Sequence, residues 1–262
     1  MKNLLLQQEM GNNPGILKKI QLTTKVLKNW PLVLFDKSGL KKSIRYITRS
    51  GIQFFARGQS TDVNTAVAVF SGLEYPAEFL KVKPGDTVLD LGANIGAFPL
   101  YLNSLYPKIE FHGYAIEPDR SNFEILKKNL DLNGVKFDTY NIAISSQNGT
   151  ANLTHGTKAN AVALTDEPTG LRVTTKKLST FCQEKDIDRI GLMKIDVEGA
   201  EYDIFITDME FIRERVDSII LEYHNLTAEK NKTVFLKILE NSFKIRELSS
   251  NGRVGILFCE KL

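Results

Sequence analysis

The chain has 262 residues, of which 42% are hydrophobic, and its formal net charge at pH 7 is +3. This length suits one large α/β domain with added elements, and the apolar share is ordinary for a packed core. The two cysteines, Cys182 and Cys259, lie far apart without metal-ligand spacing, which argues against a disulfide framework and favours a reducing, cytoplasmic setting. We expect no signal peptide, because Met1–Met10 lacks the pattern of one, and no apolar run approaches the ~18 residues of a membrane span.

Positive charge is concentrated at the N-terminus. Residues 1–60 hold 11 lysines and arginines against 2 acidic residues, whereas the remaining residues hold 23 against 29. Such a segment could attract an anionic substrate, a nucleic acid or a membrane surface, or it could be a solvated face. Because aromatic residues do not alternate with these lysines as in base-stacking surfaces, we expect no nucleic-acid partner. We therefore treat residues 1–75 as a basic helical extension and residues 76–262 as the main domain.

The predicted elements change character along the chain. The first 50 residues are predicted to be helical, with breaks at Gly11–Gly15 and Pro31. Phe54–Arg57 is typical of a short strand, and a helix is predicted over Thr61–Phe70. From residue 87 onward strands and helices alternate, which predicts a parallel sheet with right-handed crossovers. The elements predicted in this region are strands 87–91, 110–116 and 136–144 and helices 96–106 and 119–132.

The second half of the chain continues this alternation. Residues 149–154 are predicted to be a strand, and the polar residues 155–172 a loop near the site or a mobile lid. Asn251-Gly252 is a strong hairpin signal between the last two strands. The further predicted elements are strands 192–197, 218–223, 243–248 and 254–260 and helix 227–239. Together these elements predict a mostly parallel seven-stranded sheet with helices on both faces and a C-terminal antiparallel hairpin, the layout of Rossmann-like class I methyltransferases.

A glycine turn is the most informative stretch. Val88–Phe98 predicts a buried strand, a tight turn and the start of a helix, with Asp90 at the end of the strand, where an open α/β sheet binds its ligands. A dinucleotide fingerprint places a middle glycine beside a pyrophosphate, but Ala93-Asn94 stands there and Asp90 would repel that anion. A carboxylate suits the amino group and sulfonium of S-adenosylmethionine (SAM). The turn therefore favours SAM and argues against an NAD-linked oxidoreductase or epimerase.

Glu117 ends the second predicted core strand. An acidic side chain there can accept hydrogen bonds from both hydroxyls of a ribose. Alternatively, its charge could stabilise the N-terminus of the following helix. Because SAM and NAD share that ribose, Glu117 supports a nucleoside cofactor without choosing between the two.

The second dense motif is Met193–Glu201. Strand alternation sends Lys194, Asp196 and Glu198 to one side, and Glu201 follows on the next helix. Four charged side chains at the end of an apolar strand predict a functional edge. Asp196 could hold a substrate hydroxyl or a metal, and we also expect it to contact the cofactor. Lys194 could pair with a carboxylate or polarise a substrate oxygen.

Glu222 and His224 share a face at the end of the next predicted strand. Of the three histidines, only His224 combines a strand-end position with nearby acids, so it is the best candidate for a general base. Methyl transfer to an alcohol needs such a base together with in-line positioning of the acceptor. The alternative role is a structural hydrogen bond. Asp196, Glu222 and His224 could also hold a divalent metal, but strand alternation alone would bring the same three together, so we assign no metal ligands.

With these motifs in view, the chain resembles the FkbM-type SAM-dependent methyltransferases over roughly residues 50–225. In chain order the resemblance rests on Arg57, Asp62 and Tyr75, then Asp90-Leu-Gly-Ala-Asn-Ile-Gly, Ala115-Ile-Glu-Pro, Asn141-Ile-Ala-Ile-Ser, Lys194-Ile-Asp-Val-Glu-Gly-Ala-Glu and Leu221-Glu-Tyr-His. The glycine turn and the Lys194 string are weak alone and specific together. Arg57 and Asp62 match the family's pattern upstream of the domain, so they could close over the cofactor or form a buried ion pair.

The resemblance implies a class I methyltransferase fold and O-methylation, often of sugars or natural-product hydroxyls. It also implies that Glu117 contacts the ribose and that Asp138 or Asn141–Ala143 lies near the adenine, with Ala143 as a backbone contact. The residues that it places at the methionine end of SAM are Asp90, Gly92, Asn94 and Gly96. The basic N-terminus and the 155–172 loop are not part of the family's motifs.

Two further function classes are weighed against this one. A catalytically idle SAM-binding module predicts a degraded acceptor half, whereas Lys194, Asp196, Glu222 and His224 are all present. A nucleic-acid amino-methyltransferase often carries an Asn/Asp-Pro-Pro-aromatic string where this chain has Asp196–Gly199. We therefore predict a SAM-dependent O-methyltransferase acting on a hydroxyl of a small molecule or glycan. No pattern in the sequence sets the acceptor or the oligomeric state.

Overall fold

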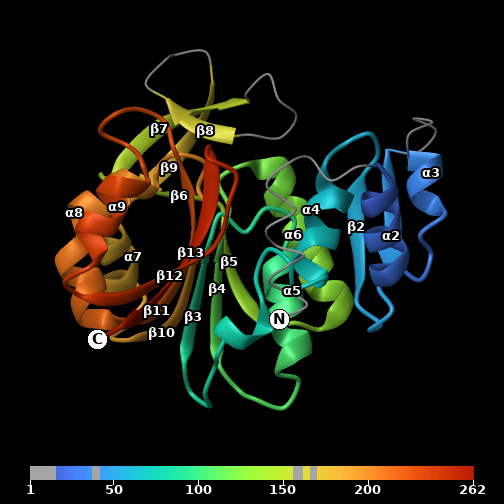
Figure 1. Cartoon of the computed structure of the whole chain (residues 1–262), viewed down its shortest axis with the longest axis horizontal. Coiled ribbons are helices and arrows are strands. Elements are labelled where there is room, and N and C mark those ends of the chain that lie inside the picture. The colour runs from blue at the N-terminus through green and yellow to red at the C-terminus, as the bar shows by residue number, and fades with distance from the viewer. Residues whose placement is uncertain (1–15, 37–41, 156–161, 166–169) are drawn as a thin grey trace.

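The computed structural model describes residues 16–36, 42–155, 162–165 and 170–262 (Figure 1). Its main sheet has seven strands in the order β12-β13-β11-β10-β3-β4-β5. These strands are β3 (Thr87–Leu91), β4 (His112–Ile116), β5 (Phe137–Tyr140), β10 (Ile190–Ile195), β11 (Val216–His224), β12 (Phe243–Ser250) and β13 (Val254–Lys261). All pairings from β5 to β11 are parallel, and β13 runs antiparallel to both of its neighbours. The predicted mostly parallel sheet with an antiparallel C-terminal hairpin is confirmed.

Helices cover both faces of this sheet, as strand alternation requires (Figure 1). Val88 belongs to the core on one face, whereas Leu89 and Leu91 belong to the core on the other. The first core packs under α4 (Asp62–Phe70), α5 (Ala97–Leu105) and α6 (Arg120–Asn133), and the second under α7 (Leu178–Glu184), α8 (Glu201–Arg215) and α9 (Lys232–Leu239). Among the helices described, none has the length and apolar surface that crossing a bilayer requires.

A second sheet lies above the carboxyl ends of the main strands (Figure 1). It has the order β6-β9-β7-β8 and consists of β6 (Ala143–Ile144), β7 (Gly149–His155), β8 (Val162–Thr165) and β9 (Leu171–Lys176). The predicted single strand 136–144 is therefore wrong. The chain leaves the main sheet at Asn141, whose amide donates to the carbonyls of Glu117 and Pro118, both at 2.9 Å.

The predicted loop 155–172 is also wrong in part. Residues 162–165 and 171–176 are strands that pair with β7, and polar residues on both sides obscured them in the sequence. The rest of the predicted lid, residues 156–161 and 166–169, lies outside the described residues.

The N-terminal region adds a two-stranded sheet beside the domain (Figure 1). Its elements are α2 (Ile16–Val26), α3 (Leu32–Asp36), β1 (Ser43–Ile47) and β2 (Gln53–Arg57), and the short helix η1 (Ala77–Phe79) follows α4. The prediction that the first 50 residues are helical is wrong at β1. In that strand Ile44 and Tyr46 are buried between exposed neighbours, and the Tyr46 ring stacks on Phe54 of β2 at 5.5 Å. Two alternating residues are too short a signal to identify a strand before its partner is known.

Candidate active site

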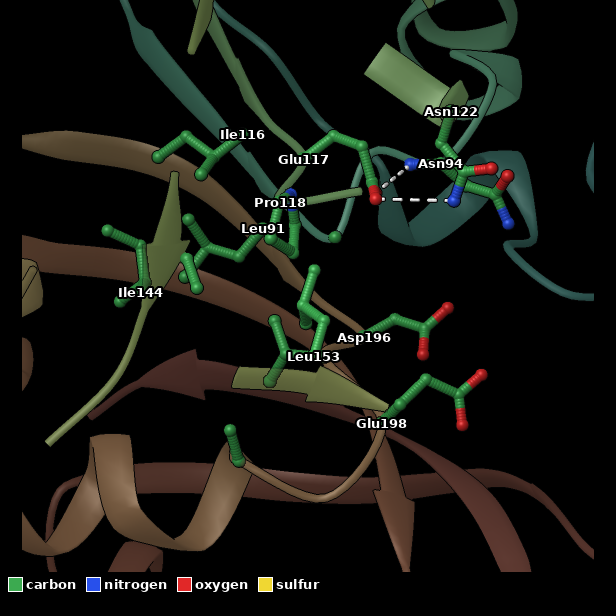
Figure 2. Close-up of a pocket in the computed structure, with 14 residues that line it drawn as sticks. Leu91, Asn94, Ile116, Glu117, Pro118, Asn122, Ile144, Leu153, Asp196 and Glu198 are labelled. Carbon is green, nitrogen blue, oxygen red and sulfur yellow. Dashed lines mark hydrogen bonds between the residues drawn. The ribbon is translucent and has the colours of Figure 1, made fainter. Parts of the chain in front are cut away.

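A cavity opens at the carboxyl ends of β3, β4 and β10 (Figure 2). It lies at the edge of a parallel sheet where such folds bind their ligands. Its apolar wall includes Ile116 at the end of β4, Ile144 of β6 and Leu153 of β7, so the second sheet forms part of the cavity. Of the residues predicted to hold a cofactor, those that line it are Gly92, Asn94, Glu117, Ala143 and Asp196.

The glycine turn after β3 forms one side of the cavity, and it lies very close to the residue that follows β10. Gly92 has a φ of +80°, and a Cβ at this position would lie 1.7 Å from the carbonyl oxygen of Asp196. Glycine alone fits such a contact. Asn94 also adopts the left-handed conformation, with a φ of 49°. Its backbone N–H then points at the end of β4 and donates to Glu117 Oε2 at 2.8 Å.

Glu117 is held by three donors, two of them visible in Figure 2. Besides the Asn94 N–H, the Asp119 backbone N–H donates at 2.9 Å and the Asn122 side-chain amide at 3.2 Å, both to Oε1. Glu117 is only 4% exposed, and burial raises its pKa to about 7 although these three donors favour the carboxylate. The carboxylate is therefore fixed in direction at the cavity wall.

Three of the predicted cofactor residues lie elsewhere. Asp90 is fully buried, and its carboxylate lies 3.1 Å from Nζ of Lys194 on the neighbouring strand. The carboxylates of Asp90 and Asp196 outweigh the effect of burial and raise the pKa of Lys194. Asp90 was predicted to face the cation of SAM, and the structure places it beside a cation of the protein, Lys194. Gly96 is the N-cap of α5, and Asp138 is exposed on β5.

A group of carboxylates lies beside the cavity. Asp196, at the end of β10, has a side-chain oxygen within 4.8 Å of oxygens from Glu222 of β11 and Glu74 of the segment after α4. Burial is the main cause that raises the pKa of Glu74 to about 7 and that of Asp196 to about 6. Burial, with the charges of Asp196 and Glu74, also raises the pKa of Glu222 well above its ordinary value. Sequence analysis missed Glu74, since no local signal shows that this segment approaches β10.

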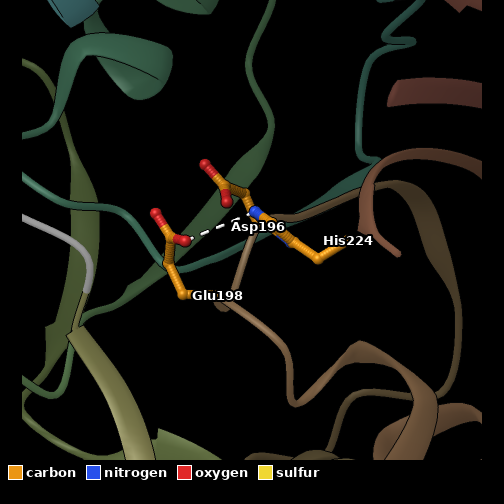
Figure 3. Close-up of side chains that lie close together, drawn as sticks. All are labelled: Asp196, Glu198 and His224. Atoms are coloured by element: carbon orange, nitrogen blue, oxygen red, sulfur yellow. Dashed lines mark ion pairs between the residues drawn. The ribbon is translucent and has the colours of Figure 1, made fainter. Parts of the chain in front are cut away.

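His224 is surrounded by acids. Its Nε2 lies 3.3 Å from Glu198 (Figure 3). The same nitrogen lies 3.6 Å from Glu222, and Nδ1 lies 3.2 Å from Glu201. Burial lowers the pKa of His224, but hydrogen bonds and charges from these carboxylates outweigh it and raise the pKa to about 11. The surrounding carboxylates therefore favour the imidazolium at neutral pH, a form that has no lone pair to take a proton. This arrangement disfavours the predicted role of His224 as general base.

Asp196, Glu222 and His224, weighed above as an alternative metal trio, do not form one group with metal-ligand spacing. The groups with metal-ligand spacing among the described residues are Asp196, Glu198 and His224, and Glu74, Asp196 and Glu222. Both nitrogens of His224 already face carboxylates, whereas a metal ligand needs a free ring nitrogen. Only the second group offers oxygen ligands alone.

Glu201 explains why these residues converge. Its side chain is fully buried at the start of α8, where a negative charge stabilises the helix N-terminus. Oε1 accepts hydrogen bonds from the backbone N–H groups of Val197 at 3.3 Å and Gly199 at 3.1 Å, in addition to its contact with His224. One buried carboxylate thus holds the loop after β10 against the end of β11. β10 ends at Ile195, so the strand alternation from which the directions of Asp196 and Glu198 were predicted does not apply to these two residues.

Comparison with known proteins agrees with this geometry. The model of the methyltransferase FkbM domain family matches residues 90–249. The 31-O-demethyl-FK506 methyltransferase FkbM of Streptomyces tacrolimicus is 25% identical over 201 residues, which cover 64% of this chain and 76% of that protein. Methyltransferase sdnD of Sordaria araneosa is 29% identical over 172 residues, covering 52% of this chain and 65% of that protein. These matches confirm the resemblance inferred from the motifs.

A solved structure supports the fold. The crystal structure of methyltransferase FkbM from Methylobacillus flagellatus KT aligns with a TM-score of 0.51 and 16% identity. The alignment covers 88% of this chain and 59% of that protein. The chain therefore spans less than two thirds of the length of the M. flagellatus protein and of sdnD.

Proposed function

The chain belongs to the FkbM methyltransferase family of SAM-dependent enzymes, and from this premise we propose that it methylates a hydroxyl of a small molecule or glycan. One relative supports oxygen as the acceptor atom, because the name of the S. tacrolimicus enzyme specifies a 31-O-demethyl substrate. The acidic site argues against a nucleic-acid substrate. Carboxylates of Glu74, Asp196 and Glu222 beside the cavity would repel a phosphodiester backbone.

The cavity fits the adenosyl part of SAM. Glu117 faces it with a fixed carboxylate, the arrangement that accepts hydrogen bonds from two ribose hydroxyls. Ile116, Ile144 and Leu153 offer an apolar wall for the adenine. Oδ1 of Asn94 is a buried acceptor without a partner among the described residues. A free acceptor at this place suits the amino group at the methionine end of SAM.

The acceptor hydroxyl is proposed to lie against Asp196. Asp196 lines the cavity and also belongs to the carboxylate group, so it connects the cofactor side to the acceptor side. SAM supplies an electrophilic methyl group on a sulfonium. In the proposed step the acceptor oxygen forms a bond to that methyl carbon, the carbon–sulfur bond breaks with its electrons on sulfur, and Asp196 takes the hydroxyl proton. Lys194, whose Nζ lies 3.8 Å from Asp196, favours its ionised form.

His224 has a supporting role in this proposal. As an imidazolium it partly balances the negative charges of Glu198, Glu201 and Glu222. It thereby keeps Glu222 beside Asp196 without taking part in proton transfer. This role differs from the base predicted from the sequence and gives the imidazolium an electrostatic function.

The observation that carries the proposal is the position of Asp196, shared between the cavity and the carboxylate group. The test begins with calorimetric titration of the purified chain with SAM, S-adenosylhomocysteine and NAD. We expect saturable binding of both adenosyl ligands and no binding of NAD. A screen of hydroxylated sugars and polyketides with methyl-labelled SAM should then give labelled methyl ethers. Label transferred only to amines or to nucleic acid would overturn the proposed acceptor class.

A further inference from the structure

Residues upstream of the family match are joined to α6 by asparagine side chains. Asn133 accepts from the backbone N–H of Gln53 at 3.0 Å and donates to its carbonyl, at 2.6 Å. One turn earlier, Asn129 does the same with Phe55, at 2.7 and 3.1 Å. These two amides pair with β2 as a neighbouring strand would. Asn129 also donates to the carbonyl of Ile95 at 2.8 Å, which joins β2 to the glycine turn.

Arg57 continues the same edge of β2, two residues beyond Phe55. Its guanidinium is fixed by Asp62, which accepts from Nε at 2.9 Å and from Nη2 at 2.8 Å. The side chain of Asp62 is only 1% exposed and accepts the Arg57 backbone N–H as well, at 2.9 Å. This bidentate pair holds the planar fork in one orientation. Nη2 is thereby directed at α6, where it donates to Oδ1 of Asn122 at 2.7 Å.

Asn122 carries this orientation to the cavity. Its Oδ1 is taken by Arg57, so its Nδ2 faces Oε1 of Glu117, at 3.2 Å. An amide rotated by half a turn would place oxygen against the carboxylate and nitrogen against the guanidinium, and both contacts would be repulsive. Asn122 is 7% exposed and lines the cavity. Arg57 therefore determines which end of the Asn122 amide faces Glu117, namely the nitrogen that donates to the carboxylate.

We propose that Arg57 is a positioning residue of the cofactor site, which acts through Asn122 to hold the Glu117 carboxylate toward the ribose of SAM. This inference rests on the proposed function, in which Glu117 binds that ribose. It also means that the β1–β2 hairpin, predicted as part of a separate N-terminal extension, contributes to cofactor binding. The residue lies outside residues 90–249, which the family model matches.

The chemistry of Glu117 makes this contact consequential. Burial raises the pKa of Glu117 to about 7, and the Asn122 amide is one of the donors that oppose this rise. Without Arg57, the Asn122 amide can rotate, and Glu117 then loses a donor and gains a proton more readily. A protonated carboxyl accepts fewer hydrogen bonds from two hydroxyls. Removal of Arg57 should therefore weaken the contacts with the ribose more than the contacts with the rest of SAM.

A ligand-by-variant cycle tests this selectivity. The full chain and its Arg57→Met variant are titrated with S-adenosylhomocysteine and with its 2′,3′-dideoxyribose analogue, which lacks the hydroxyls that Glu117 would bind. We expect Arg57→Met to weaken binding of S-adenosylhomocysteine by about tenfold, as for loss of a charge-assisted hydrogen bond, and binding of the analogue by less than about twofold. Equal weakening of both ligands would mean a merely structural role and would overturn the proposal.

Matched variants keep the outcome decisive. Arg45→Met on the same hairpin removes an exposed arginine that pairs with Gln53 and should change neither affinity. Asn122→Ala leaves the Arg57–Asp62 pair intact and should reproduce the ligand-selective loss, which tests the contact between Asn122 and Glu117. If Arg57→Met fails to fold, the role of Arg57 is decided by Arg57→Lys. Arg57→Lys, which lacks the fork, should fall between wild type and Arg57→Met. A wild type that binds no adenosyl ligand would overturn the proposed function itself, and one that binds both ligands equally would overturn only the ribose contact.

Discussion

The two halves of the site hold their carboxylates in opposite ways. Glu117, on the side that we propose for the cofactor, accepts hydrogen bonds from two backbone N–H groups and one amide. Asp196, on the side that we propose for the acceptor, lies with Glu74 and Glu222 within 4.8 Å, and its Oδ1 has no hydrogen-bond partner among the described residues. The protein fixes the direction of the first carboxylate with three donors, whereas one oxygen of the second has no donor from the described residues.

This difference has an energetic meaning. A buried polar atom without a partner costs about 1–3 kcal/mol, and carboxylates brought together repel one another. A fold tolerates such a cost mainly where binding or catalysis needs it. A cofactor that the members of a family share can bind to a prearranged site. The acceptor side instead keeps unsatisfied acceptors that a hydroxyl can fill by donation.

The largest expected effect comes from removing the acceptor-side charge. Asp196→Asn should lower turnover by about 10²- to 10⁴-fold, the usual contribution of a general base. S-adenosylhomocysteine affinity should change much less, because the amide keeps the shape of the side chain. In the wild type, turnover should fall as pH drops through about 6, where Asp196 gains a proton. Rates measured from pH 5 to 9 check this, with Asp188→Asn, at an exposed aspartate that pairs with Arg215, as the control.

The outcome that contradicts this prediction is specific. If Asp196→Asn retains turnover, or if its acid limb remains, proton transfer belongs to another group of the acceptor side. Glu222 and Glu74 would then be the next candidates, since both carboxylates lie beside Asp196.

A glycine pair tests how tightly the cofactor half is built. Gly92→Ala should weaken the affinity for S-adenosylhomocysteine by about a hundredfold or more, because its Cβ would lie 1.7 Å from the carbonyl oxygen of Asp196. Gly85→Ala is the matched control, with a φ of +82° but no atom within 4 Å of the new Cβ. Calorimetry with circular dichroism separates lost binding from lost fold. If both variants bind equally poorly, backbone strain and not the close contact is responsible.

The same contrast shows what the sequence could predict. Gly92 and Glu117 stand at the ends of adjacent strands, and Asn251-Gly252 marks a hairpin turn, so their places depend on a few neighbouring residues. The local pattern therefore predicted the sheet and the turn, and it also predicted a carboxylate at the strand end that we propose for the ribose. Gly92 and Glu117 also belong to the motifs on which the family resemblance rests.

The remainder of the site depends on packing between distant segments. Glu74 approaches Asp196 only because the segment after α4 passes over the end of β10, and Asn122 matters only because Arg57 reaches it. The charge of His224 could not be predicted either, because it depends on Glu201 packing from α8 against Nδ1. A strand pattern gives the face of a residue but not the partners that set its pKa.

His224 offers a smaller and pH-dependent effect. Its pKa in the folded chain is about 11, above the ordinary 6.5, so the stability it contributes is complete below pH 6.5 and is lost as pH rises toward 11. The difference in unfolding free energy between wild type and His224→Gln should therefore shrink over this range. Urea unfolding at several pH values measures it, and NMR of the ring nitrogens should show an imidazolium at pH 7. A ring that titrates near 6.5 would restore the general-base hypothesis.

The smallest expected effect concerns metal ions. The oxygens of Glu74, Asp196 and Glu222 are spaced closely enough for one divalent cation, and hard cations such as Mg²⁺ take carboxylate oxygens. The proposed step needs none, since Asp196 takes the proton and Lys194 lies 3.8 Å from it. Dialysis against EDTA should therefore leave turnover within about twofold, a change smaller than the loss of a single hydrogen bond. If EDTA abolished turnover and Mg²⁺ restored it, the unsatisfied carboxylates would be metal ligands. The two halves of the site would then differ in the ligand that each one binds.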